Sequence, residues 1–292
     1  MGGGSWTTDD YKTFASTTYR ASVSSDGSLS GTYSAGQLYR AEALKDSMNP
    51  YKIIRECADT EEHPHTKPVI LALDVTGSMG DTAVEIAKKL NVVMTNLYES
   101  VEDVEFCVMG IGDLHYDGAP IQMSQFESDI RIAESIDDIY FEFGGGGNKW
   151  ESYTAAWYMG AYHTKLDCLE RGEKGIIITI GDERLNPHLP KKRLAEVTGD
   201  SLQAAIATPE LYMEAIKKFD LYHIDVYHNG FRSEQESKAI RKSFQLLDEQ
   251  QRFASVKTDE VADAIIDIIC GKFDTATGAS SVQENENGDI VW

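Results

Sequence analysis

Residues 69 to 78 of the sequence read Val69-Ile-Leu-Ala-Leu-Asp-Val-Thr-Gly-Ser78. The five apolar residues that open this stretch are typical of a strand buried on both faces of a parallel sheet. Oxygen-bearing side chains follow at alternate positions, with a carboxylate at Asp74 and hydroxyls at Thr76 and Ser78. The residues from Asp81 to about Glu99 have a helical pattern. The stretch therefore predicts a strand and a helix joined by an oxygen-rich loop.

Strands and helices are predicted to alternate along the following residues. The run Gly175-Ile-Ile-Ile-Thr-Ile180 is expected near the centre of the sheet, because its apolar side chains need cover on both faces. Only the turn-rich residues 112–120 separate predicted strands at Val104–Ile111 and Ile121–Phe126, and so short a connection favours an antiparallel hairpin. The other predicted elements are helices at about 151–169, 209–219, 233–249 and 259–271, and strands at Leu221–Tyr227 and Phe253–Val256. The pattern predicts an α/β fold with a mostly parallel central sheet, helices on both faces and one antiparallel edge strand.

Three regions are predicted along the chain. Residues 1–67 form an N-terminal extension, with short helices expected within Gln37–Cys57 and a linker at Glu61–Pro68 that contains two prolines. The first 35 residues are rich in Ser, Thr, Gly and Tyr, and we expect them to become ordered only against another surface. The main domain spans residues 68–271, and residues 272–292 form a polar tail.

Charge and cysteine content narrow the possible partners. The 48 acidic residues outnumber the 27 Lys and Arg residues, which gives a net charge of -21. Such a charge repels phosphate backbones and anionic lipid, so it disfavours nucleic acid and membrane surfaces as partners. Residues 1–30 lack a secretory signal pattern, and the longest apolar stretch is too short to span a bilayer. Four widely spaced cysteines without a C-x-x-C pair favour reduced thiols, no zinc site and a cytoplasmic location.

Three loops are expected to meet at one edge of the sheet. The loop after Leu73, the glycine run Gly144–Gly147 before Glu151, and Gly181-Asp182-Glu183 should all face the crevice at the carboxyl ends of the strands. Two carboxylates and two or three hydroxyls that converge with water suit an octahedral ion at about 2.1 Å, such as Mg²⁺ or Mn²⁺.

Asp74-Val-Thr-Gly-Ser78 resembles the D-x-[ST]-x-S motif of the metal-ion-dependent adhesion site (MIDAS) in von Willebrand factor A (vWA) domains. The resemblance covers about residues 68 to 271 and implies a Rossmann-like three-layer sandwich that binds one Mg²⁺ or Mn²⁺ ion. In that family a threonine of a glycine-rich second loop and an aspartate after the fourth strand complete the site. Asp182 matches this aspartate. Glu151-Ser152 after the glycine run and Gly181-Asp182-Glu183 also resemble the matching segments of bacterial and bacteriophage vWA proteins of unassigned function.

The second loop departs from the family pattern, because no threonine directly follows Gly144–Gly147. Ser152 and Glu151 are the candidates to replace it, with Thr154 next. A direct Glu151 ligand would add a third carboxylate and weaken the attraction for an acidic partner group. The ligands that the resemblance implies are therefore Asp74, Thr76, Ser78 and Asp182, joined by Glu151 or Ser152.

The resemblance implies a non-enzymatic protein that binds partner proteins through its ion. An AAA+ ATPase, a phage structural or assembly component and a bacterial conflict or stress system are all open as partners, and a phage-encoded chain would be virion-associated.

The alternative is a Mg²⁺-dependent phosphatase of the haloacid dehalogenase type. That chemistry needs a general acid two positions after its first aspartate, where Thr76 stands, and a later acidic residue near Asn186. The sequence also lacks the P-loop motif of nucleotide hydrolases.

Several other polar residues have structural interpretations. Asp113 and Asp117 lie in the predicted hairpin turn, where Asp side chains commonly bond the local backbone. His163, Cys168 and His223 fall within helix or strand patterns, and we expect them to be packed rather than to bind a ligand.

Overall fold

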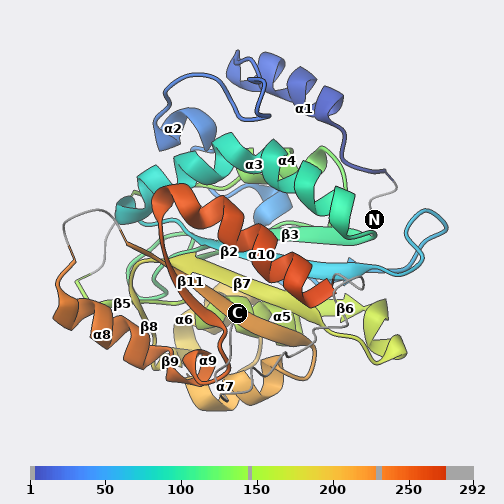
Figure 1. Ribbon diagram of the computed structural model, residues 1–292. Coiled ribbons are helices and arrows are strands. Elements are labelled where there is room, and N and C mark those ends of the chain that lie inside the picture. Colours follow the sequence, from blue (N-terminus) through green and yellow to red (C-terminus); the bar gives the residue numbers. More distant parts are fainter. Residues whose placement is uncertain (1–3, 144–146, 228–231, 274–292) are drawn as a thin grey trace, which may run out of the picture.

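The computed structural model describes residues 4–143, 147–227 and 232–273, which form a mixed α/β fold around a six-stranded sheet (Figure 1). The strand order is β12-β11-β7-β2-β3-β4. All neighbouring strands are parallel except β3 and β4, so the antiparallel edge hairpin is confirmed. The apolar strand β7 lies between β2 and β11, near the centre, as the sequence predicts. The strand bounds are β2 (Lys67–Asp74), β3 (Val104–Ile111), β4 (Ile121–Met123), β7 (Gly175–Gly181), β11 (Phe219–Tyr227) and β12 (Phe253–Lys257).

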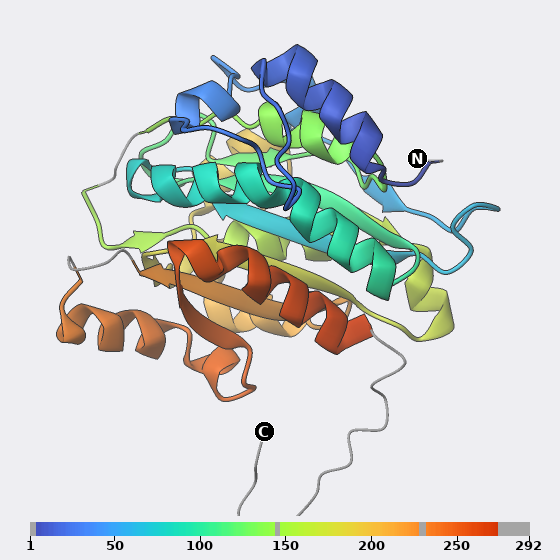
Figure 2. The ribbon, with the colours of Figure 1, turned by 45° about the horizontal axis from the view of Figure 1, so that its top comes forward.

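Helices cover both faces of the sheet, because strands such as β2 carry apolar side chains on both faces. Its alternate residues Val69, Leu71 and Leu73 pack in one core, while Ile70 and Ala72 pack in a second core on the opposite face. The first core is closed by α3 (Gly80–Ser100), α4 (Arg131–Asp137) and α10 (Val261–Phe273). The second is closed by α5 (Thr154–Tyr162), α6 (Lys191–Thr198), α7 (Thr208–Ala215), α8 (Glu234–Ser243) and α9 (Gln245–Asp248). The result is a three-layer arrangement (Figures 1 and 2).

The N-terminal segment packs on the outer side of α3, where Figure 2 shows α1 (Thr8–Phe14) and α2 (Ala35–Leu38). Trp6 Nε1 donates to Asn91 Oδ1 at 3.0 Å, the Tyr11 hydroxyl donates to Ala87 O at 3.2 Å, and the Tyr39 hydroxyl donates to Ala83 O at 2.9 Å. The three acceptors are four residues apart, so they lie along one face of α3. The surface against which this segment is ordered is therefore a helix of the same chain.

The predicted helix at 151–169 is shorter in the structure. It ends at Tyr162, and β6 (Thr164–Leu166) and a 3₁₀ turn (Asp167–Arg171) follow. β6 pairs in parallel with β1 (Arg55–Cys57), a strand within the region where the sequence indicates short helices. The His163 ring bonds Ile53 O at 2.8 Å and Asp200 Oδ2 at 2.7 Å. These contacts with distant residues compete with further helical turns.

The predicted helix at 233–249 is divided into α8 and α9 at Phe244. The Phe244 ring is buried and stacks on His223, with 3.8 Å between the ring centroids. This packing holds the backbone of Phe244 at a ψ of 21°, outside the helical region. Sequence periodicity also missed α4, α6 and several short strands, namely β5 (Trp150–Glu151), β8 (Arg184–Leu185), β9 (His188–Leu189) and β10 (Ile206–Ala207). The 3₁₀ turn Asp46–Met48 lies within Gln37–Cys57, where the sequence indicates short helices.

Two further expectations concern membranes and thiols. Within the described ranges, no helix combines the length and the apolar character needed to cross a bilayer. Cys57, Cys107, Cys168 and Cys270 are all free thiols, and the first three are buried.

Candidate metal centre

The candidate site lies where the direction of the strand connections changes. From β2 the chain passes through α3 to β3 on one side, whereas from β7 it passes through α6 and α7 to β11 on the other side. Ligands of open α/β sheets gather at the carboxyl ends of the strands at such a switch point. Asp74 is the last residue of β2, and Asp182 directly follows β7. The topology therefore places both carboxylates at the same crevice.

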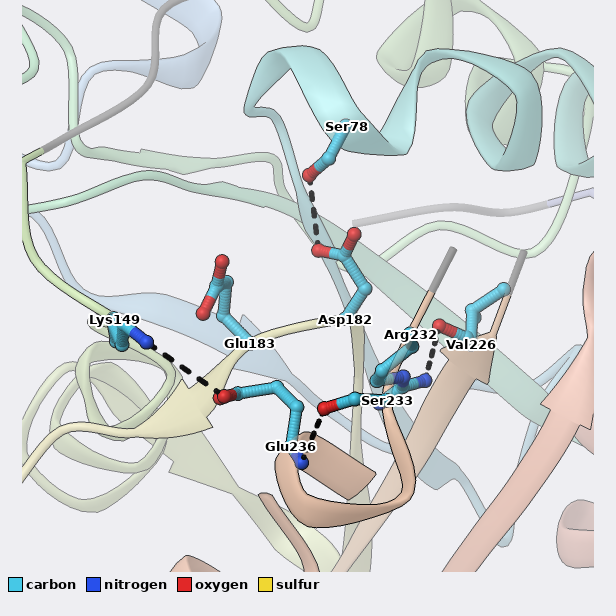
Figure 3. A pocket seen from close by; sticks show the side chains of 8 residues that line it. All are labelled: Ser78, Lys149, Asp182, Glu183, Val226, Arg232, Ser233 and Glu236. Carbon is cyan, nitrogen blue, oxygen red and sulfur yellow. Dashed lines mark hydrogen bonds and ion pairs between the residues drawn. The ribbon is translucent and has the colours of Figure 1, made fainter. Parts of the chain in front are cut away.

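Hydrogen bonds connect the four residues of the first and third loops. The Thr76 N–H and hydroxyl donate to Asp74 Oδ1 at 2.9 and 2.6 Å. Thr76 Oγ1 lies 3.4 Å from Ser78 Oγ, which in turn donates to Asp182 Oδ1 at 3.0 Å (Figure 3). Neighbouring oxygens of an octahedral shell with a radius of about 2.1 Å are about 3 Å apart. The spacing of these oxygens fits a small divalent ion.

The charges of the site also fit a cation. Asp74 is fully buried, and its carboxylate accepts from the backbone and hydroxyl groups of Thr76 and from a tyrosine. Burial and the nearby charge of Asp182 raise the pKa of Asp74 to about 7. A cation between the two carboxylates would offset both causes. Among the described residues, no group of three or more His, Cys, Asp or Glu side chains could hold a metal, so an ion here would depend on hydroxyls and water as well.

The second-loop candidates have other contacts in the structure. Glu151 is buried, and Glu151 Oε1 accepts from the Ser152 N–H at 3.1 Å. Burial and the charge of Asp74, followed by those of Asp113 and Asp117, raise the pKa of Glu151 to about 10. Ser152 Oγ accepts from the Leu114 N–H at 3.0 Å, and Thr154 Oγ1 accepts from Asn186 Nδ2 at 2.6 Å. Glu151 therefore interacts electrostatically with Asp74, while the hydroxyls of Ser152 and Thr154 are hydrogen-bonded to groups outside the site.

Tyr153 is the residue of this loop that contacts the site, and sequence reasoning missed it. Its hydroxyl donates to Asp74 Oδ2 at 2.8 Å and accepts from the Glu183 N–H at 3.2 Å. Gly181 makes room for it, because a Cβ at Gly181 would lie 2.0 Å from the Tyr153 hydroxyl oxygen. The sequence signal was weak, since a tyrosine between two predicted ligands resembles an ordinary core residue.

A cavity of about 640 Å³ opens beside Ser78 and Asp182 (Figure 3). Two cationic side chains among the described residues line it, and both are engaged: Arg232 Nη1 pairs with Asp225 Oδ1 at 2.5 Å, and Lys149 Nζ lies 3.9 Å from Glu236 Oε2. The cavity also meets the start of α8, where Ser233 Oγ accepts from the Glu236 N–H at 3.1 Å. Glu183 and Val226 also line the cavity. Its wall thus carries side chains of both charges.

The polar residues for which the sequence predicts a structural role have backbone contacts or are buried. Asp113 Oδ1 accepts from the His115 N–H at 2.8 Å, and Asp117 Oδ2 accepts from the Asp113 N–H at 2.6 Å. Both carboxylates therefore stabilise the backbone of the hairpin turn, as the sequence predicts. His163, Cys168 and His223 are buried.

No protein-family model and no curated protein sequence matches the chain. Among solved structures, two crystal structures of the pilus adhesin SpaC from Lactobacillus rhamnosus GG are similar, with 12% and 13% identity and TM-scores of 0.48 and 0.47. The similarity covers 78% of this chain but only 33% and 34% of the adhesin chain. Proximal thread matrix protein 1 from the mussel byssus has 12% identity and a TM-score of 0.43, over 70% of this chain and 48% of the mussel chain. The chain thus spans a third to a half of these proteins, and similarity at this level carries no statement about function.

Proposed function

We propose that the chain is a vWA-type protein that binds one Mg²⁺ or Mn²⁺ ion and uses the site to bind a partner protein. The observation that carries the proposal is the hydrogen-bonded series Asp74–Thr76–Ser78–Asp182 at the switch point of the sheet. The resemblance of Asp74-Val-Thr-Gly-Ser78 to the MIDAS motif adds to it.

Each residue has a distinct task in this proposal. Asp74 and Asp182 supply the negative charge, and Thr76 and Ser78 supply neutral oxygens from a loop that the start of α3 holds in place. A bound ion would offer positive charge to an oxygen of the partner. Because Ser78 and Asp182 line the 640 Å³ cavity, the partner group would approach from that side.

Exposed aromatic residues in the loops that follow the strands support a protein partner. Tyr116, Phe143 and Trp150 are 60%, 51% and 38% exposed and come from the hairpin turn and from both sides of the glycine run. Exposed aromatic side chains are enriched at protein interfaces. An AAA+ ATPase or an assembly component of a phage or bacterium is compatible with this surface, and the net charge of -21 argues against nucleic acid.

Titration calorimetry with Mg²⁺ and Mn²⁺ tests the proposed site. We expect one ion per wild-type chain and no binding by Asp74→Ala. The control is Asp263→Ala, which removes an exposed acid from α10. A folded Asp74→Ala variant that binds with wild-type affinity and stoichiometry would show that the ion, if any, binds elsewhere.

A further inference from the structure

Tyr153 occupies the position from which the second loop faces the candidate site. Its ring is buried at the start of α5, and its hydroxyl lies between the end of β2 and the residues after β7. The neighbouring hydroxyls of Ser152 and Thr154 are bonded to Leu114 N–H and to Asn186 instead. Of these three consecutive side chains, Tyr153 is therefore the one whose oxygen contacts a carboxylate of the site.

We propose that Tyr153 is the second-loop positioning residue of the metal site, in place of Ser152 and Glu151. This inference rests on the proposed function. The hydroxyl proton of Tyr153 is directed to Asp74, because the oxygen already accepts from the Glu183 N–H. One hydroxyl thus connects the carboxylate of the first loop to the backbone of the third loop.

The connection orients both carboxylates. Thr76 holds Asp74 Oδ1 and Tyr153 holds Asp74 Oδ2, so the plane of this carboxylate is restrained from two sides. The same hydroxyl restrains Glu183, the residue after Asp182. Outer groups that orient metal ligands in this way typically contribute about 10- to 100-fold to metal affinity.

The surroundings keep the Tyr153 hydroxyl in place. The Tyr153 ring contacts His223 and Phe244, with centroid distances of 5.1 and 5.9 Å. Gly181 leaves the space that the hydroxyl fills, since a Cβ there would overlap the oxygen. The ring is therefore supported independently of its hydroxyl, and removal of the oxygen alone should preserve the packing.

Tyr153→Phe tests the proposal, and Tyr158→Phe is the matched control. Tyr158 lies on the same helix, and its hydroxyl donates to Asp200 Oδ2 at 2.5 Å, outside the metal centre. By Mg²⁺ calorimetry we expect Tyr153→Phe to lose about 10-fold or more in affinity and Tyr158→Phe to bind like the wild type. Circular dichroism should show that both variants fold.

A second readout reports on the phenol itself. Mg²⁺ should change the near-ultraviolet tyrosine absorption of the wild type and of Tyr158→Phe, and this change should be absent from Tyr153→Phe. If Tyr153→Phe binds Mg²⁺ as tightly as the wild type while Asp74→Ala does not bind, the inference is wrong and the proposed function stands. If the wild type binds neither Mg²⁺ nor Mn²⁺, the proposed function fails and the inference fails with it.

Discussion

Glu151 is a buried carboxyl group that lies within the electrostatic influence of Asp74, Asp113 and Asp117. Together with burial, these charges raise its pKa to about 10, far above the ordinary value of about 4.3. The folded protein therefore binds a proton at Glu151 that the unfolded chain releases at neutral pH. The contribution to stability is fully present below about pH 4 and is lost progressively as the pH rises toward 10.

Glu151→Gln should consequently stabilise the metal-free protein at alkaline pH. The glutamine keeps an oxygen for the Ser152 N–H and cannot ionise, so we expect a gain of at least about 1 kcal/mol at pH 8 that disappears near pH 4. Chemical denaturation at the two pH values measures it, with the exposed Glu62→Gln as control. An equal free energy of unfolding for wild type and Glu151→Gln at pH 8 would show that Glu151 ionises readily in the fold.

The same variant decides between two roles of Glu151. If the carboxylate binds the ion directly, Glu151→Gln weakens Mg²⁺ binding in spite of its greater stability. If Tyr153 is the second-loop residue of the site, Mg²⁺ affinity stays the same, because the glutamine replaces a protonated and uncharged Glu151 that does not bind the ion. Calorimetry under the conditions used for Tyr153→Phe makes the two results directly comparable.

At the scale of elements, the N-terminal segment is held to the body of the protein at its first described residue. The Gly4 carbonyl lies 2.9 Å from His63 Nε2, and His63 Nδ1 lies 3.2 Å from Asp103 Oδ1. Both partners are acceptors, so both ring nitrogens must carry a proton for the two bonds to form together. Burial lowers the pKa of His63, but the bonds to Gly4 and Asp103 and the charges of Asp103 and Glu105 outweigh it, and the pKa is raised.

Attachment of the N-terminal segment should therefore weaken at alkaline pH. A histidine with a raised pKa contributes stability fully below its unfolded value of about 6.5, and this contribution is lost as the pH rises through the folded value. We expect amide hydrogen exchange near Gly4 to Trp6, corrected for its intrinsic pH dependence, to show less protection at pH 9 than at pH 6. His63→Gln should show low protection at both values. Protection that stays constant in the wild type would indicate that Ser128, whose hydroxyl also donates to Gly4 O at 2.6 Å, is sufficient.

At the scale of the whole molecule, we consider whether the cavity beside Asp182 could be a phosphatase active site. The position two residues after Asp74 is Thr76, and its hydroxyl donates to Asp74 itself. Asn186, four positions beyond Asp182, donates to Thr154 and His188 O. Neither side chain can act as the carboxylic general acid that a haloacid dehalogenase-type phosphatase requires.

Purified protein should consequently show no phosphatase activity in a broad screen of phosphoesters with Mg²⁺. A phosphatase preparation run in parallel controls for the assay, and Asp74→Asn controls for contaminating activity. Robust turnover by the wild type that disappears in Asp74→Asn would favour the enzyme over the binding protein. Turnover that persists in Asp74→Asn would come from a contaminant.

The sequence by itself determined those features that depend on neighbouring residues and on burial. Alternating apolar runs and helical patterns were sufficient for the mostly parallel sheet, the central position of Gly175–Ile180 and the antiparallel edge, because strands buried on both faces need apolar side chains throughout. The placement of Asp74 and Asp182 at one crevice was also predictable, since parallel strands bring their carboxyl ends to the same edge.

Only the tertiary structure decided which side chain of the second loop reaches the site, where two helices end and what covers α3. The three consecutive side chains from Ser152 to Thr154 point in different directions. Each one is oriented by a distant hydrogen-bond partner: Leu114 N–H for Ser152, Asp74 for Tyr153 and Asn186 for Thr154. The end of α5 at Tyr162 and the break at Phe244 likewise depend on β1 and on His223. Local patterns report that a residue is buried, but they do not identify the distant group against which it packs, and that group sets the orientation of the side chain.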